Sequence, residues 1–252
     1  MNDLDTVSQA CAYLLETVPE AEPVRAYLKT RASTESIKHF EFGYFPDQNN
    51  IKALTSIVDE SILVRAKLRF DRANNDGIFR KIKSSLLEYH NLIMPYRDAY
   101  GKTVALVGRT LASSKEMEDL KIPKYKNTFF KKKSHVFGFN DARPFILKSD
   151  GVIVVEGQFD CIAAHERGIK NVVALGSASM TLYQLGLLMR YTKNIYLFLD
   201  NDKAGREGAE RILNRLGSFA CFENKHVPLG YKDLDDFLKD CQDTTYQDLI
   251  HL

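Results

Sequence analysis

The sequence predicts an α/β fold, α+β overall. A basic N-terminal part that mixes helices and strands precedes a parallel-rich central sheet with flanking helices. Unbroken apolar runs at 152–155 and 194–199 are typical of parallel strands that are buried on both faces. Amphipathic segments alternate with these runs, as expected for crossover helices. We therefore predict an N-terminal subdomain over 1–148, a parallel-sheet domain over 149–226 and a short acidic, helical extension over 227–252.

Composition excludes several classes of protein. The 252 residues are 44% hydrophobic, enough for a substantial core, and 35 Lys and Arg against 33 Asp and Glu leave a net charge of only +2, so total charge does not indicate a nucleic-acid binder. The four cysteines form no CxxC pair, which argues against a structural zinc site and fits a reducing cytoplasm. No apolar run approaches membrane-spanning length, so we expect a cytoplasmic protein without a membrane anchor.

The first 85 residues predict small helices followed by a loop. Leu4, Val7 and Leu14 recur at helical spacing and predict an amphipathic helix over Asp3–Thr17. Pro19 ends it, and two short helices are expected to run through Leu28 and His39. An amphipathic segment covers 51–68. From 69 to 85 the pattern is poor, with a turn signal at 74–77 between basic residues, and we predict a basic loop.

A β-hairpin and a lysine-rich stretch follow. The segments Leu92–Arg97 and 102–108 predict two strands that are joined by a tight turn ending in Gly101. Seven lysines then fall within the nineteen residues 115–133, interleaved with Tyr125, Phe129 and Phe130. Such a mixture suits phosphate contacts combined with base or sugar stacking. A solvated basic loop with core aromatics explains the same pattern, and the stretch alone does not decide between them.

In the second half, strands and helices alternate along the chain. We expect strands at 152–155, 172–175, 194–199 and 219–223, with helices at 159–167, 181–190 and 203–216 between them. A connector over 225–231 leads to a short helix that is preceded by acidic residues.

Carboxylates follow two of these strands at their C-terminal ends. Glu156 comes directly after the first strand, and Asp200 and Asp202 follow the third. Because ligands of open parallel sheets bind beyond the carboxyl ends of the strands, we expect the three side chains to share one crevice. Unpaired carboxylates there would repel one another, and a divalent cation removes the conflict. Hard oxygen ligands favour Mg²⁺ bound together with substrate phosphates.

These motifs resemble a known family. The segments 154–160, 175–177 and 199–206 look like the glutamate and paired-aspartate motifs of a Toprim domain, the metal-binding fold shared by bacterial-type primases, topoisomerases and some nucleases. Further motifs, in the order of the catalytic core of DnaG-type primases, extend the resemblance over most of the chain: Tyr27-Leu28 with Arg31, Phe42–Pro46, Pro95–Asp98 with Gly101, Gly108–Leu111, Pro123–Thr128 and Phe130–Lys132 with Phe137-Gly138. Asp233 and Asp235 are similar to the family's last acidic pair.

The resemblance implies a DNA primase that makes short RNA primers on a single-stranded DNA template from nucleoside triphosphates, with Mg²⁺ or Mn²⁺. Its metal ligands would be Glu156, Asp200, Asp202, Asp233 and Asp235. The catalytic set would comprise Glu156, Asp200, Asp202, Lys124 and Arg109, and nucleotide or template binding would fall to Arg109, Lys124, Tyr125, Asn127, Lys131 and Lys132.

Departures from the family pattern imply further partners. The family's zinc-ribbon domain and its helicase or helicase-binding domain have no counterpart in the sequence, so we expect a separate replicative helicase, a zinc-domain partner and an origin in a phage or mobile element. Where the family usually has a pair of arginines before the hairpin, this chain has Glu88-Tyr89-His90-Asn91.

Two other classes of function remain open. A Toprim nuclease would use the same carboxylates with water as the nucleophile but would not need Arg109 and Lys124. A non-catalytic subunit that binds single-stranded nucleic acid would keep the basic stretch and could lose the acids. A topoisomerase fits less well, because strand passage needs a much larger chain and a nucleophilic tyrosine in its own domain.

Overall fold

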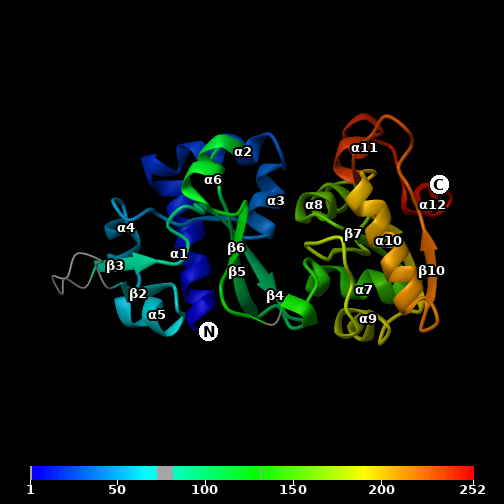
Figure 1. Cartoon of the computed structure of the whole chain (residues 1–252), viewed down its shortest axis with the longest axis horizontal. Helices are drawn as coiled ribbons and strands as arrows, with labels where there is room; N and C mark the ends of the chain where they lie inside the picture. Colours follow the sequence, from blue (N-terminus) through cyan, green and yellow to red (C-terminus); the bar gives the residue numbers. More distant parts are fainter. Residues whose placement is uncertain (1, 73–81, 131) are drawn as a thin grey trace. The chain divides into compact units, whose positions relative to one another are not determined.

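The computed structural model describes residues 2–72, 82–130 and 132–252, and it divides the chain into two compact units. One unit comprises 1–96 and 102–130, and the other comprises 97–101 and 131–252. Both mix helices and strands (Figure 1), so the predicted fold class is confirmed.

The first unit is built on a four-stranded sheet with the order β1-β4-β5-β6. Its strands are β1 (Gly43–Tyr44), β4 (Leu92–Arg97), β5 (Thr103–Arg109) and β6 (Tyr125–Asn127), and β2 (Arg69–Arg72) pairs separately with β3 (Ile82–Ser85). The helices are α1 (Asp3–Thr17), η1 (Pro19–Ala21), α2 (Glu22–Lys29), α3 (Thr34–His39), α4 (Lys52–Thr55), α5 (Glu60–Arg65) and α6 (Ser114–Leu120).

Helix α1 packs on this sheet in the way that its apolar face predicts. Val7, Cys11 and Leu14 are buried, and the helix contacts β1 and β5. A glycine is required where they meet, because a Cβ on Gly43 would lie 2.6 Å from the Cβ of Cys11. The predicted bounds Asp3–Thr17 are confirmed.

Two expectations for this unit need correction, and the structure adds detail to a third, the segment 51–68. The segment predicted as a basic loop instead begins and ends in the antiparallel strands β2 and β3, with Arg69 opposite Ser85; residues 73–81 lie outside the described part. The amphipathic segment 51–68 forms two short helices, α4 and α5. The lysine-rich stretch is not one loop, since it contains α6, which begins at a capping box of Ser113 and Glu116, and β6.

The second unit has a four-stranded parallel sheet with the order β10-β9-β7-β8. Its strands are β7 (Val152–Val155), β8 (Val172–Ala174), β9 (Asn194–Phe198) and β10 (Cys221–Asn224). The helices are η2 (Lys132–Ser134), α7 (Phe139–Ser149), α8 (Gln158–Glu166), α9 (Leu182–Leu188), α10 (Lys203–Leu216), α11 (Leu234–Asp240) and α12 (Tyr246–Ile250). The predicted alternation of strands and helices is confirmed.

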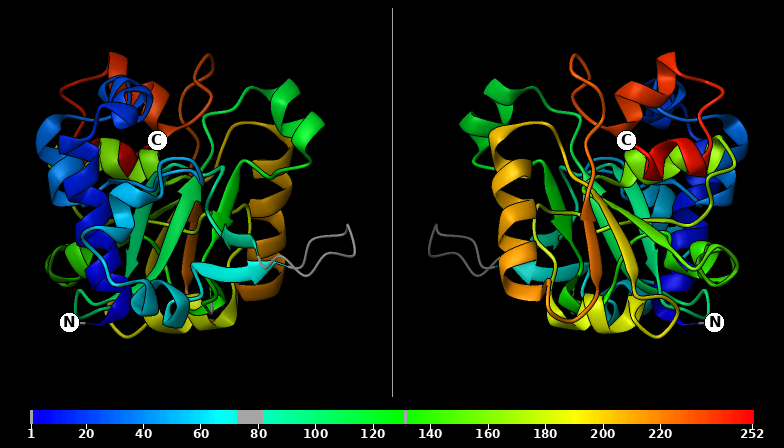
Figure 2. Two further views of the ribbon diagram at one scale, coloured as in Figure 1. Left: turned by 90° about the vertical axis from the view of Figure 1, so that its left-hand side faces the viewer. Right: turned by 90° about the vertical axis from the view of Figure 1, so that its right-hand side faces the viewer.

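Helices cover both faces of this parallel sheet. Alternate residues of the strands, such as Val152 and Val154, share a core with residues of α7, α9 and α10, and Figure 2 shows α10 lying alongside β9 and β10. Helix α8 contacts β7 and β8 and packs against α11. The carboxyl edge of the sheet is thus left to the loops that carry the acidic residues. None of the described helices is both long and apolar enough to cross a bilayer.

Candidate active site

Parallel pairing brings the predicted carboxylates to one edge of the sheet. Val155 at the end of β7 lies opposite Phe198 at the end of β9, so Glu156 and Asp200 leave the sheet on the same side. The two strands are direct neighbours in the strand order. The edge predicted from the apolar runs is therefore present in the folded chain.

Electrostatics show that these acids interact. The pKa of Glu156 is raised to about 7, first by burial and then by the negative charges of Asp200 and Asp202. Lys232 opposes the shift, and its Nζ lies 3.9 Å from Oδ2 of Asp200 and 3.4 Å from Oδ2 of Asp233. Negative charge is thus concentrated at this edge, and one lysine compensates for it only in part.

The backbone of helix α10 fixes the position of two of the acids. Asp202 caps the helix, because its Oδ1 accepts a hydrogen bond from the backbone N–H of Gly205 at 2.8 Å. Gly205 must be a glycine at this contact, since an added Cβ would lie 2.1 Å from the carbonyl oxygen of Asp200. A larger side chain would push α10 away from the Asp200 turn.

Asn201, which the sequence analysis did not single out, ties the acidic turn to the connector before α11. Its Nδ2 donates to the carbonyl oxygens of Val227 at 3.1 Å and Tyr231 at 2.9 Å, and its backbone N–H donates to the carbonyl oxygen of Lys232 at 2.8 Å. The turn that bears Asp200 and the segment that bears Asp233 are therefore held together by one side chain and one backbone bond.

The last two predicted metal ligands lie at the start of α11. Asp233 caps the helix through a bond from the backbone N–H of Asp236 at 2.9 Å, and its Oδ2 faces Lys232. Asp235 is buried, and its Oδ2 lies 3.0 Å from Nζ of Lys239. The structure therefore joins Asp233 to the Asp200 turn through Lys232 and places Asp235 in an ion pair with Lys239.

Asp160, whose role the sequence left undecided, has a clear structural role. One carboxylate oxygen accepts the backbone N–H of Gly157 at 3.1 Å, and the other accepts that of Asp235 at 3.0 Å. Burial, followed by the charge of Asp233, raises its pKa to about 7. Asp160 thus connects the loop after β7 to the start of α11.

The donor chemistry fits a hard divalent cation. Glu156, Asp200 and Asp202 offer only oxygen atoms. Burial and then the charges of Asp200 and Asp202 raise the pKa of Glu156, and a bound cation would offset both effects. Within the described residues, no three His, Cys, Asp or Glu side chains are already arranged as a coordination set. The carboxylates would have to draw closer around the ion, as expected for side chains that repel one another without it.

In the first unit, Arg109 is packed between aromatic rings. Its Cζ lies 4.7 Å from the ring centre of Tyr27 and 5.5 Å from that of Tyr125, and Nη1 donates to the Tyr125 hydroxyl at 2.9 Å. Strand pairing explains the second contact, because Arg109 on β5 lies directly opposite Tyr125 on β6. The sequence named Tyr27 as part of a family motif without a role, and the structure places it against the guanidinium.

The other basic candidates are arranged around β6. Lys124 is exposed, with Nζ 5.9 Å from the ring centre of Tyr125, and its carbonyl oxygen accepts the backbone N–H of Thr110 at 3.0 Å. Asn127 is half-buried at the end of β6. Lys131 lies outside the described residues, and so does the side chain of Lys132.

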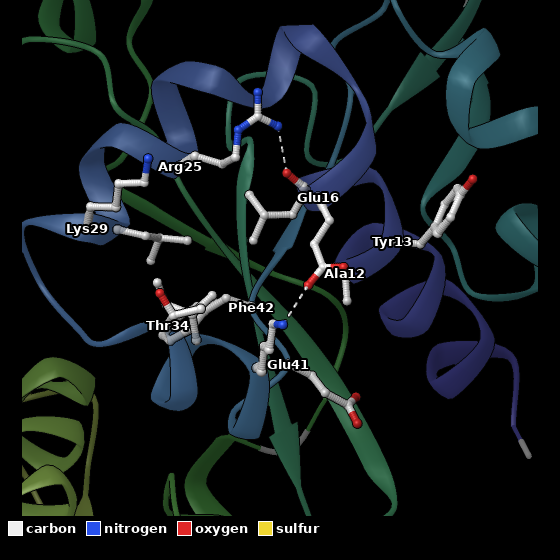
Figure 3. Close-up of a pocket in the computed structure, with 12 residues that line it drawn as sticks. Ala12, Tyr13, Glu16, Arg25, Lys29, Thr34, Glu41 and Phe42 are labelled. Carbon is white, nitrogen blue, oxygen red and sulfur yellow. Dashed lines mark hydrogen bonds and ion pairs between the residues drawn. The ribbon is translucent and has the colours of Figure 1, made fainter.

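An apolar hollow between α1, α2 and α3 contains none of the predicted site residues (Figure 3). Its volume is about 390 Å³, and Ala12 and Phe42 are among the residues that line it. An ion pair between Lys38 and Glu16, 3.9 Å apart, crosses its rim. No local pattern predicts this hollow, because its lining comes mainly from three helices, each of which has an ordinary amphipathic pattern.

Family comparisons agree with this geometry. Residues 12–143 match the family described as "DNA primase catalytic core, N-terminal domain", and residues 153–238 match the family described as "Toprim-like". The DNA primase of Aquifex aeolicus is 28% identical over 242 residues, which cover 93% of this chain. The chain spans only 46% of that relative's length.

Solved structures show the same fold. The RNA polymerase domain of Mycobacterium tuberculosis primase DnaG superimposes with a TM-score of 0.80 at 26% identity, covering 99% of this chain and 81% of that one. The same domain in complex with a double-stranded DNA oligomer that has a 6-nucleotide overhang gives a TM-score of 0.76 at 26% identity, covering 99% of this chain and 79% of that one.

Proposed function

The chain belongs to the DNA primase family, and we propose that it is a catalytic core that synthesises short RNA primers on single-stranded DNA. In the proposed reaction, a ribonucleotide 3′-hydroxyl attacks the α-phosphate of an incoming nucleoside triphosphate. A P–O bond forms to the attacking oxygen, the bond to the β-phosphate breaks, pyrophosphate leaves, and the hydroxyl proton passes to solvent.

The carboxylate edge of the second unit carries the proposal. Glu156, Asp200 and Asp202 would hold Mg²⁺ or Mn²⁺, with Asp233 and Asp235 as further ligands. When bound, the metal supplies positive charge that lowers the pKa of the attacking hydroxyl and stabilises the leaving group. Asn201 and the helix cap at Asp202 would keep these side chains in place for that task.

The basic and aromatic candidates would bind the phosphates and the bases. Arg109 and Lys124 of the first unit, with Lys131 and Lys132 from the start of the second, would contact triphosphate or template phosphates. Tyr125 and Asn127 would contact sugars or bases. The proposed division of labour is a template- and nucleotide-binding subdomain over 1–148, a metal-binding Toprim domain over 149–226 and an acidic extension over 227–252. The two compact units support a separation of the first part from the rest, with the boundary at 130/131 and with 131–252 in a single unit.

Template and partners follow from the family. The DNA complex of the Mycobacterium tuberculosis domain supports a DNA template for this chain as well, and nucleoside triphosphates are the substrates that the reaction requires. We propose that the chain acts in the cytoplasm with a separate replicative helicase and a zinc-domain partner, in the replication of a phage or mobile element.

Substitution of the carboxylates tests the proposal. Asp202→Asn and Glu156→Gln remove a charge at nearly constant size, and asparagine can still cap α10. Both variants should fold, lose Mg²⁺ binding measured by calorimetry, and lose primer synthesis. Glu223→Gln is the control, because that side chain is more than a third exposed on the neighbouring strand β10 and pairs with Lys225. Normal synthesis by folded Glu156→Gln would refute the assigned site.

A further inference from the structure

A second hollow lies in the unit that contains the parallel sheet. It is at the edge of that sheet opposite the carboxylates. Its volume is about 560 Å³, and its lining comes from the end of α7, the loop between α8 and β8, and the segment before α12. The end of α7 precedes strand β7, and the loop after α8 precedes strand β8, whereas Glu156 follows β7. The four residues of β7 separate the two edges by about 13 Å.

Three cations line this hollow: Lys148, Arg167 and Lys170. Among the described residues, neither lysine forms an ion pair with a carboxylate. Arg167 is held in place, because its Nε and Nη2 donate to the carbonyl oxygen of Leu238 at 3.3 and 3.2 Å. One acid, Asp243, also lines the hollow, so the formal charge of its lining is positive.

Polar and aromatic groups complete the lining. Asn171 is 3% exposed, and its Nδ2 donates to Ser149 Oγ at 3.0 Å and to the carbonyl oxygen of Gly151 at 2.9 Å. Tyr246 packs so closely on Gly151 that a Cβ there would lie 2.3 Å from the tyrosine hydroxyl. Asn171 and Tyr246 thus contribute ordered side chains to the lining of the hollow.

We propose that this hollow binds a diphosphate group. Three cations with one opposing acid match an anion of several charges better than a single carboxylate, and the fixed Arg167 loses little conformational freedom on binding. The volume falls within the usual range for small-ligand sites and exceeds what one phosphate needs. The ligand is either free pyrophosphate or the diphosphate of a nucleotide, and the proposal does not depend on primer synthesis.

Binding can be measured on the full chain by NMR, with pyrophosphate and ADP as probes. EDTA in the buffer keeps divalent ions from recruiting phosphates to the carboxylate edge. We expect both probes to shift the amide signals of Gly168 and Asn171, which report on this hollow alone. Equal affinities identify free pyrophosphate as the source, and tighter ADP binding identifies a nucleotide.

Three variants decide whether the cations are responsible. The Lys148→Ala, Lys170→Ala double variant should weaken binding at least about tenfold, since two charge-assisted contacts are lost. Lys193→Ala, an exposed lysine of the same unit outside the hollow, should leave the affinity unchanged.

Asp243→Asn should tighten binding, because it removes the one opposing charge, and a misfolded protein cannot gain affinity. Absence of shifts with both probes, or shifts that persist unchanged in the double variant and in Asp243→Asn, would overturn the proposal.

Discussion

At the scale of single residues, the packing of Arg109 between Tyr27 and Tyr125 restricts a side chain that would otherwise be mobile. A guanidinium over an aromatic face gains about 0.5–2 kcal/mol, depending on its exposure to solvent. The hydrogen bond from Nη1 to the Tyr125 hydroxyl fixes its rotation as well. Arg109 is therefore held in one orientation, which suits the phosphate contact that we propose for it.

We predict that Tyr27→Leu will raise the KM for nucleoside triphosphate severalfold, up to about tenfold, with a smaller effect on kcat, because the ring contact that positions Arg109 is lost. Tyr27→Phe keeps the ring and should stay close to the wild type. Steady-state kinetics of both variants separates the ring from the hydroxyl. Equal defects in the two would show that the hydroxyl, and not the ring, is what matters.

Lys124 offers a second test at this scale. Its role would be to neutralise charge that grows on the transferring and leaving phosphates. Lys124→Ala should therefore raise the activation free energy of synthesis by about 3 kcal/mol, which lowers the rate roughly a hundredfold. Metal binding should persist, because an ammonium group is not a ligand. Single-turnover synthesis and Mg²⁺ calorimetry on the same preparation check both statements, and a parallel loss of metal binding would contradict the role.

His90 gives a prediction about pH. It is buried, its Nε2–H donates to the carbonyl oxygen of Pro123 at 2.7 Å, and burial lowers its pKa below 6.5 despite that bond. As the pH falls through 6.5, His90 becomes protonated in the unfolded chain but stays neutral in the folded chain. His90 therefore lowers the free energy of unfolding over this range.

The His90→Gln variant should lack this contribution, since glutamine does not titrate and can still donate to Pro123. Urea denaturation at several values between pH 7.5 and 5.5 checks it. The buried acids titrate in both proteins and cancel in the difference between them. A difference that does not vary with pH would contradict the argument.

At the scale of elements, the start of α10 is the most constrained helix end in the site. We predict that Gly205→Ala lowers the free energy of unfolding by roughly 1–3 kcal/mol, because its Cβ would overlap the Asp200 carbonyl. Gly186→Ala is the matched control: it also lies within a helix, α9, but its Cβ would meet nothing within 4 Å. That variant should be stabilised by about 0.5–1 kcal/mol.

Denaturant titration of both glycine variants supplies the measurement. Gly205→Ala should also weaken Mg²⁺ binding, since the Asp200 turn has to move, whereas Gly186→Ala should bind as the wild type does. Equal stability of the two variants would mean that α10 adapts without disturbing the turn.

How much of each element the sequence predicts depends on where its structural signal lies. Apolar runs predict β7 and β9. The acids directly after these runs predict the carboxylate edge from local sequence alone. Strands β2 and β3 were not predicted, because their residues are mostly polar and Arg69 is buried through an ion pair with Glu60 at 3.2 Å. Helix α6 begins at a capping box of Ser113 and Glu116. It was not predicted, because the many lysines around it indicate a solvated loop equally well.

Residues that act through distant partners were harder to find. Asn201 bonds to carbonyl groups 26 and 30 positions along the chain, and no local pattern encodes such a contact. The same holds for the ring of Tyr27 against Arg109. The cations of the second hollow come from two separate segments, the end of α7 and the loop between α8 and β8, which only the folded sheet brings to one edge.

At the scale of the whole molecule, the candidate groups are divided between the two units: Arg109, Lys124 and their aromatic neighbours belong to the first, and the carboxylates belong to the second. A nuclease of the Toprim type needs the acids alone, whereas primer synthesis needs both sets. The central claim is therefore that the chain joins nucleotides by using groups from both units.

Parallel assays of dinucleotide synthesis and single-stranded DNA cleavage test this claim most directly. They compare the wild type, Lys124→Ala and Glu156→Gln at fixed Mg²⁺ and salt, with and without a zinc-domain partner. We predict synthesis by the wild type, a loss of about a hundredfold in Lys124→Ala, and none in Glu156→Gln. Cleavage that depends on Glu156 but is indifferent to Lys124, without nucleotide incorporation under any condition, would contradict the account.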